Sequence, residues 1–68
     1  MKDEILTFEN EVNMAYLHGT NQITNARFMR LVEIYHALGN PPVQTWGCSS
    51  CWTEVIGYFE QYIKDLKR

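Results

Sequence analysis

The chain has 68 residues, of which 46% are hydrophobic and 13% aromatic, and it contains only two prolines and four glycines. This composition excludes a disordered tail and predicts one globular helical domain over residues 1–68. A core of this size is marginal, so a clip, a metal or a partner is expected to add stability. The formal net charge of −2 provides no general positive field for a phosphate backbone, which argues against nucleic acid as a partner.

Residues 3–17 form the first predicted helix. Its apolar residues recur at steps of three and four, as Ile5, Phe8, Val12, Ala15 and Tyr16. Asp3 and Glu4 stand where the positive end of the helix dipole favours acidic side chains. Gly19 follows the last periodic residue and accepts the left-handed conformation that ends many helices.

Residues 24–38 form the second predicted helix. One face carries Phe28, Leu31, Val32, Tyr35 and Leu38. Thr24 is a suitable N-cap, and Ile23 is placed to pack against Phe28 as a hydrophobic staple. Gly39 and the Pro41-Pro42 pair end the helix, because proline cannot continue it.

Residues 51–67 form the third predicted helix, which has the cleanest apolar period of the three. Its stripe consists of Trp52, Val55, Ile56, Phe59, Tyr62, Ile63 and Leu66. Ser50 is the expected N-cap. No segment alternates as a strand does, so we predict an all-α, three-helix domain with a Pro-Pro and Cys-x-x-Cys loop before the last helix. Short connections favour the first two helices as antiparallel neighbours, crossed by the third.

The chain's two cysteines, Cys48 and Cys51, stand two residues apart between Trp46 and Trp52. This spacing suits four kinds of chemistry. Two thiolates are half of a tetrahedral zinc site, for which His36 is the best further ligand, or a second copy could complete the set. A redox dithiol is the second interpretation, because a helix N-terminus stabilises a thiolate.

The other two interpretations of the cysteines are structural. A disulfide would fix the local turn, although so short a ring restricts the unfolded chain little. Two buried reduced cysteines would act as small apolar side chains at a crowded corner. We prefer this packing role, with or without oxidation, and therefore expect no cofactor; zinc remains the alternative.

Arg27 and Arg30 near the start of the second helix could contact phosphate in a helix-turn-helix arrangement. The acidic residues of the first helix would be repelled by DNA, so DNA binding is only a third alternative. In the simpler interpretation both arginines form surface ion pairs with those acids. Neither a catalytic Ser/His/acid set nor a glycine-rich phosphate loop occurs, so we do not expect an enzyme.

Several apolar residues fall outside the predicted core stripes: Met14, Leu17, Met29, Ile34, Tyr58 and Trp46. They predict a non-enzymatic protein–protein interaction module that binds a protein partner or itself. The candidate binding residues are Trp46, Trp52, Tyr58, Met29, Arg27 and Arg30. Alternatively, a wide core buries some of these residues, and single exposed apolar side chains need no partner.

The C-terminal two thirds of the chain contain a succession of features. An apolar helical stretch with Leu31, Ile34, Tyr35, Leu38 and Gly39 is followed by a proline-containing loop, by Cys48 and Cys51, and by an amphipathic last helix. It resembles small uncharacterised helical proteins of tailed bacteriophages. The resemblance implies a phage accessory, virion or host-targeting protein, and only the two cysteines match its motif. No signal segment or apolar run of about 20 residues occurs, so we expect a location in the cytoplasm or a virion and no membrane partner.

Overall fold

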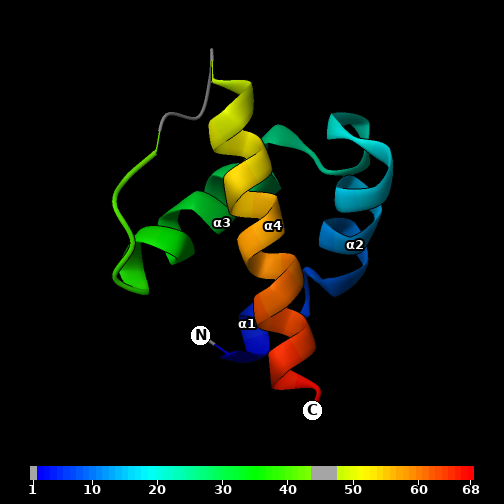
Figure 1. Cartoon of the computed structure of the whole chain (residues 1–68), viewed down its shortest axis with the longest axis vertical. Helices are drawn as coiled ribbons and strands as arrows, with labels where there is room; N and C mark the ends of the chain where they lie inside the picture. Colours follow the sequence, from blue (N-terminus) through cyan, green and yellow to red (C-terminus); the bar gives the residue numbers. More distant parts are fainter. Residues whose placement is uncertain (1, 44–47) are drawn as a thin grey trace.

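The computed structural model describes residues 2–43 and 48–68 (Figure 1). Its helices are α1 (Lys2–Leu6), α2 (Glu9–His18), α3 (Asn25–Ala37) and α4 (Ser49–Leu66), with a short 3-10 turn, η1 (Thr20–Gln22), between α2 and α3. No strand occurs in the described parts of the chain. The prediction of a small all-α domain is confirmed, and the cysteine pair lies where the loop enters the last helix, with Cys48 just before α4 and Cys51 in its first turn.

Helix α4 lies in front of α3 and beside α2, and α2 and α4 run in opposite directions (Figure 1). The main helix–helix packing is between α2 and α4, and α3 also contacts α4. The sequence favoured the first and second predicted helices as the antiparallel pair. In the structure the antiparallel partner of α2 is instead the last helix, because α3 turns away and crosses behind α4.

The first predicted helix is broken at Thr7 and Phe8, where the sequence analysis expected a continuous helix. The backbone N–H groups of Thr7 and Phe8 donate to the carbonyls three residues back, at 3.0 Å each. The Thr7 hydroxyl also donates to the Glu4 carbonyl at 2.6 Å. Threonine side chains compete in this way with the helical backbone bond, and the tighter turn separates α1 from α2.

The starts of α3 and α4 differ in how well the sequence predicted them. Thr24 is the N-cap of α3, and its hydroxyl accepts from the Arg27 N–H at 3.3 Å, as predicted. Helix α4 begins two residues earlier than expected, and its N-cap is Cys48 instead of Ser50. The Cys48 sulfur accepts from the Cys51 N–H at 3.2 Å, a cap that N-cap preferences based on oxygen do not anticipate.

One cluster of buried apolar side chains holds the helices together. It consists of Ile5, Phe8, Val12, Ala15, Ile23, Phe28, Leu31, Val32, Ile34, Tyr35, Val55, Ile56, Phe59 and Ile63. Two predictions about this core were wrong. Tyr16 is 56% exposed, and Ile34, which was placed outside the core stripe, is 1% exposed. The crossing of α3 explains Ile34, because its buried face is wider than one narrow stripe.

We predict that Phe8→Ala lowers the free energy of unfolding by about 3–5 kcal/mol, the usual loss for a fully buried phenylalanine. A domain of this size has a small free energy of unfolding, so the urea midpoint of this variant should fall sharply. Tyr16→Ala removes a ring of similar size from an exposed position and should change stability by less than about 0.5 kcal/mol. Urea unfolding followed by circular dichroism measures both; equal losses would contradict the assignment of the core.

Candidate functional site

Cys48 and Cys51 form a disulfide at the start of α4, with their Cα atoms 5.3 Å apart. Neither cysteine is fully buried, and Ser49 and Ser50 beside them are exposed. The Ser50 hydroxyl lies 3.6 Å from the Cys48 sulfur. The preferred interpretation allowed oxidation, but it placed the pair in a buried corner, whereas the disulfide is partly open to solvent.

The zinc interpretation gains no support from the geometry. Within residues 2–43 and 48–68, no three His, Cys, Asp or Glu side chains are grouped as metal ligands. His36 is exposed, and its Nδ1 lies 2.9 Å from the Asn40 carbonyl oxygen, which requires a proton on that nitrogen. A disulfide sulfur is also not the thiolate that zinc requires.

Arg27 and Arg30 contact the acidic residues of the first two helices. The Arg27 guanidinium donates to both carboxylate oxygens of Glu11, at 2.6 and 3.2 Å, and also lies 3.9 Å from the centre of the Phe8 ring. Arg30 donates to both oxygens of Glu4, at 2.7 and 2.9 Å. This arrangement matches the ion-pair interpretation and leaves these guanidinium groups engaged within the domain.

The remaining predicted binding residues do not form one site. The Trp52 ring stacks on Phe28 with centroids 6.2 Å apart, so part of this tryptophan supports the core. Met29 is 45% exposed on α3, where its sulfur accepts from the Asn25 side-chain amide at 3.8 Å. Trp46 lies outside the described residues. Of the predicted set, Trp52 contacts one aromatic ring, whereas Tyr58 belongs to a larger aromatic group.

A row of aromatic rings runs from α4 to α3. Tyr58 and Tyr62 on α4 are stacked with centroids 5.9 Å apart, and Tyr58 meets the edge of Tyr35 at 5.0 Å. Both α4 tyrosines are partly exposed, whereas Tyr35 is buried. Burial raises the pKa of the Tyr35 hydroxyl, and the nearby Glu54 carboxylate, 3.4 Å away, raises that pKa further. The sequence analysis assigned Tyr62 only to the core.

The segment 38–43 after α3 is held beside this row by side-chain hydrogen bonds. Asn40 donates from Nδ2 to the Tyr35 carbonyl at 3.0 Å, and its own carbonyl accepts from His36. Gly39 has φ +99°, a conformation in which other residues are strained. Pro41 and Pro42 are exposed, while Leu38 and Val43 pack against the core.

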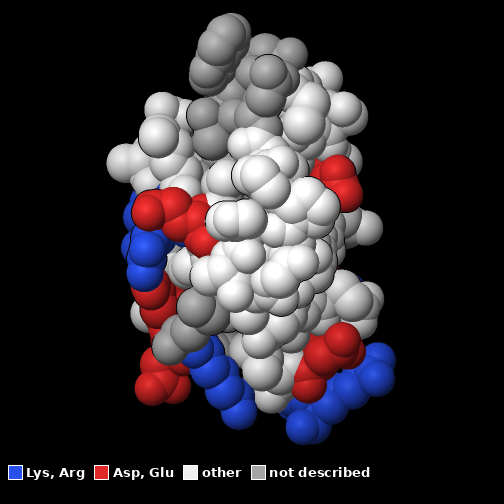
Figure 2. Space-filling view, turned by 90° about the vertical axis from the view of Figure 1, so that its left-hand side faces the viewer, with Lys and Arg blue, Asp and Glu red and all other residues white. Residues whose placement is uncertain are grey.

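This segment forms the left edge of the molecule in Figure 1, and Figure 2 views the molecule from that side. The centre of the face carries no Lys, Arg, Asp or Glu side chain, whereas charged side chains lie at its borders (Figure 2). We use the name uncharged face for the segment 38–43 together with Tyr58 and Tyr62. These tyrosines are connected to the segment through the contact of Tyr58 with the Tyr35 ring and the bond from Asn40 to the Tyr35 carbonyl.

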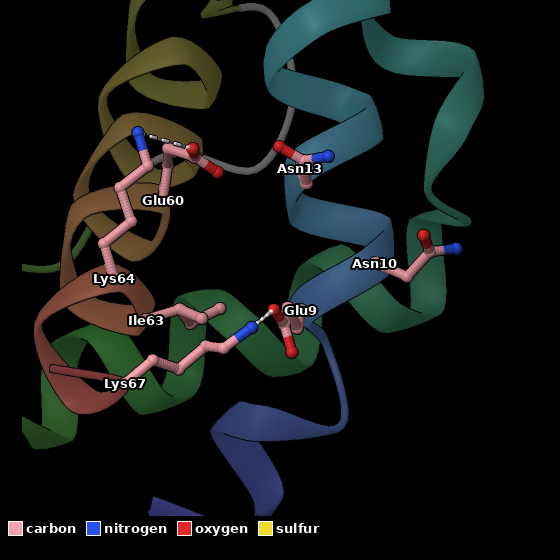
Figure 3. Close-up of a pocket in the computed structure, with 7 residues that line it drawn as sticks. All are labelled: Glu9, Asn10, Asn13, Glu60, Ile63, Lys64 and Lys67. Atoms are coloured by element: carbon pink, nitrogen blue, oxygen red, sulfur yellow. Dashed lines mark hydrogen bonds and ion pairs between the residues drawn. The ribbon is translucent and has the colours of Figure 1, made fainter.

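A separate polar groove lies between α2 and α4, with a volume of about 580 Å³ (Figure 3). Its lining residues are Glu9, Asn10, Asn13, Glu60, Ile63, Lys64 and Lys67. Lys67 pairs with Glu9 across the groove, and Lys64 pairs with Glu60 along α4 at 3.2 Å. The charges therefore balance within the groove, which gives it no preference for an anion or a cation. Sequence reasoning missed it because it depends on α2 packing beside α4.

Comparison with known protein families, curated proteins and solved structures found no match. The resemblance to phage proteins therefore stays a prediction. Among the described residues, no helix is long and apolar enough to cross a membrane.

The hydrogen bonds from Arg30 hold the pKa of the Glu4 carboxyl below its ordinary value of 4.5. A carboxyl group with a lowered pKa in the folded state stabilises the protein above its unfolded-state pKa, and this contribution is lost as the pH falls through the folded-state pKa. We therefore predict that stability declines below about pH 4.5 and that Glu4→Gln flattens this decline. Urea midpoints measured between about pH 3 and 7 provide the test. Asp3→Asn is the control, since it removes a charge from the same helix without touching Arg30; an equal flattening there would contradict the assignment.

Proposed function

We propose that the protein is a non-enzymatic protein–protein interaction module and that the uncharged face is its binding surface. The observation that carries this proposal is the fixed, exposed Pro41-Pro42 segment, which Asn40 ties to the backbone of α3 beside the aromatic row. The candidate binding residue Tyr58 belongs to this face, and Tyr62 extends it along α4.

Preorganisation supports the proposal. Ordering a flexible loop on binding lowers affinity, because each immobilised residue loses conformational freedom. Here the two prolines have restricted φ angles, and the Asn40 bonds already hold the segment that precedes them. A partner would therefore meet a segment that has little conformational entropy left to lose.

The chemistry of the face indicates the kind of partner. Tyrosines combine a rigid apolar ring with a hydroxyl, which is why they are enriched at the centres of interfaces. An uncharged centre within a charged border is also the usual layout of such surfaces. We propose as ligand an apolar segment of another protein that carries hydrogen-bond acceptors for the tyrosine hydroxyls.

Photo-crosslinking in the cells that express the protein tests the proposal. A benzophenone amino acid at position 42 should yield a discrete adduct with another protein, because Pro42 is exposed on the uncharged face. The matched control is position 13, since Asn13 is also exposed but lines the polar groove. Adducts from position 13 alone would move the binding site to the groove. An adduct of twice the chain's mass would show that the partner is a second copy of this chain instead of another protein.

We further predict that Asn40→Asp weakens capture of the same partner from position 42 by about tenfold, through loss of preorganisation. This change keeps the shape of the side chain but removes the Nδ2–H group from which the Tyr35 carbonyl accepts a hydrogen bond. Asn10→Asp on α2 makes the same chemical change in the polar groove and should leave capture unaltered. Circular dichroism confirms that both variants are folded, and equal capture by Asn40→Asp would contradict the role of the fixed segment.

A further inference from the structure

Two hydrogen-bond donors converge on one sulfur of the disulfide. The Cys51 N–H points to the Cys48 sulfur at 3.2 Å, and the Ser50 oxygen lies 3.6 Å from the same atom. Because a disulfide sulfur carries no hydrogen, the Ser50 hydroxyl must be the donor. Both donors belong to the first turn of α4, whose N-cap is Cys48. The two sulfurs are therefore chemically unequal.

We propose that Cys48 and Cys51 form a thiol–disulfide exchange site for dithiol substrates, in which Cys48 is the sulfur released as thiolate and Ser50 is its positioning residue. The inequality of the sulfurs is what separates this site from a simple clip. Exchange is faster when the departing sulfur is stabilised as an anion. Hydrogen bonds to an anion are also about twice as strong as those between neutral groups.

The reaction has two balanced steps. One thiolate of the substrate dithiol attacks the Cys51 sulfur; the bond between Cys48 and Cys51 breaks, and its electron pair leaves on Cys48. The second substrate thiolate then attacks the substrate's own sulfur in the mixed disulfide, so that Cys51 leaves as a thiolate and takes a proton from water. The substrate is oxidised by two electrons to its disulfide, and the cysteine pair is reduced. In the reverse direction the Cys51 thiolate attacks the substrate disulfide and releases one substrate thiolate. The Cys48 thiolate then attacks the Cys51 sulfur of the mixed disulfide and releases the second.

The surroundings of the pair are compatible with this chemistry. Both cysteines are partly accessible, and the adjacent serines are exposed. The first charged residue of α4 is Glu54, whose carboxylate accepts from the Tyr35 hydroxyl instead of contacting either sulfur. No ion pair between the described residues involves the start of α4, so neutral donors set the difference between Cys48 and Cys51.

Rapid alkylation of the reduced protein tests the inference. With iodoacetamide at pH 7, Cys48 should react about tenfold faster than Cys51, because the hydrogen bonds from Ser50 and from the Cys51 N–H stabilise the Cys48 thiolate. Peptide mapping by mass spectrometry assigns the two rates. A peptide with the sequence Cys-Ser-Ser-Cys supplies the baseline without the helix. Equal alkylation rates at the two cysteines would overturn the proposal and leave the disulfide as a structural clip. A ratio of the two rates in the folded protein equal to the ratio in the peptide would have the same meaning.

A serine variant separates exchange chemistry from a structural role. Ser50→Ala should slow reduction of the disulfide by dithiothreitol several-fold and lower the alkylation rate of reduced Cys48, whereas Ser50→Thr keeps the hydroxyl and should restore both rates. Ser49→Ala is the matched control, because Ser49 is an exposed neighbour of the same type. Identical rates for all four proteins would contradict the role of Ser50. The equilibrium between the wild-type protein and glutathione measures the reduction potential of the cysteine pair without any variant.

Discussion

The apolar face of α4 is the surface on which the rest of the fold depends. Val55, Ile56, Phe59 and Ile63 are all buried, and they meet α2 on one side and α3 on another. Burying such a face is worth about 1.5–3 kcal/mol per large side chain, which no surface interaction in the chain can match. Helix α4 can serve in this way because it is the longest helix and its apolar residues recur without interruption.

Two ion pairs join α3 to the two helices that precede it in the chain. Arg27 and Arg30 project from α3 to Glu11 on α2 and Glu4 on α1, so one helix contacts both halves of the broken first segment. Exposed pairs of this kind contribute little individually. Their bidentate geometry nevertheless selects one crossing direction for α3, because a rotation of the helix would separate the guanidinium groups from both acids.

The sequence predicted the helices well where periodicity and conventional caps agree. Thr24, Gly39 and the stripe of α4 all fulfil local rules, and the helices they define are present. The errors at Thr7, Cys48 and Ile34 have a different origin. The break at Thr7 depends on a side-chain bond competing with the backbone, and the cap at Cys48 depends on a sulfur acceptor. Burial of Ile34 depends on the angle at which α3 crosses α4, which no local pattern encodes.

The candidate sites, like the helices, were predicted from local sequence patterns but not in the features that depend on three-dimensional packing. The cysteine pair could be singled out from its spacing, but the inequality of its sulfurs depends on the first turn of α4, which sequence rules placed two residues too late. Tyr58 was identified only as an apolar residue outside the core, because its alignment with Tyr62 and Tyr35 depends on how α3 meets α4.

The described residues that follow α3 and those that begin α4 are held by different chemistry. At the α3 end, Asn40 satisfies a backbone carbonyl that the finished helix leaves without an N–H donor. At the α4 end, a covalent bond joins the N-cap residue to the first turn of the helix. Each device acts over a few residues and needs no additional core, which suits a chain too short to bury a long connection. Both devices leave neighbouring described residues exposed, Pro41 and Pro42 at the first and Ser49 and Ser50 at the second, so each of the two proposed sites adjoins the device that orders it.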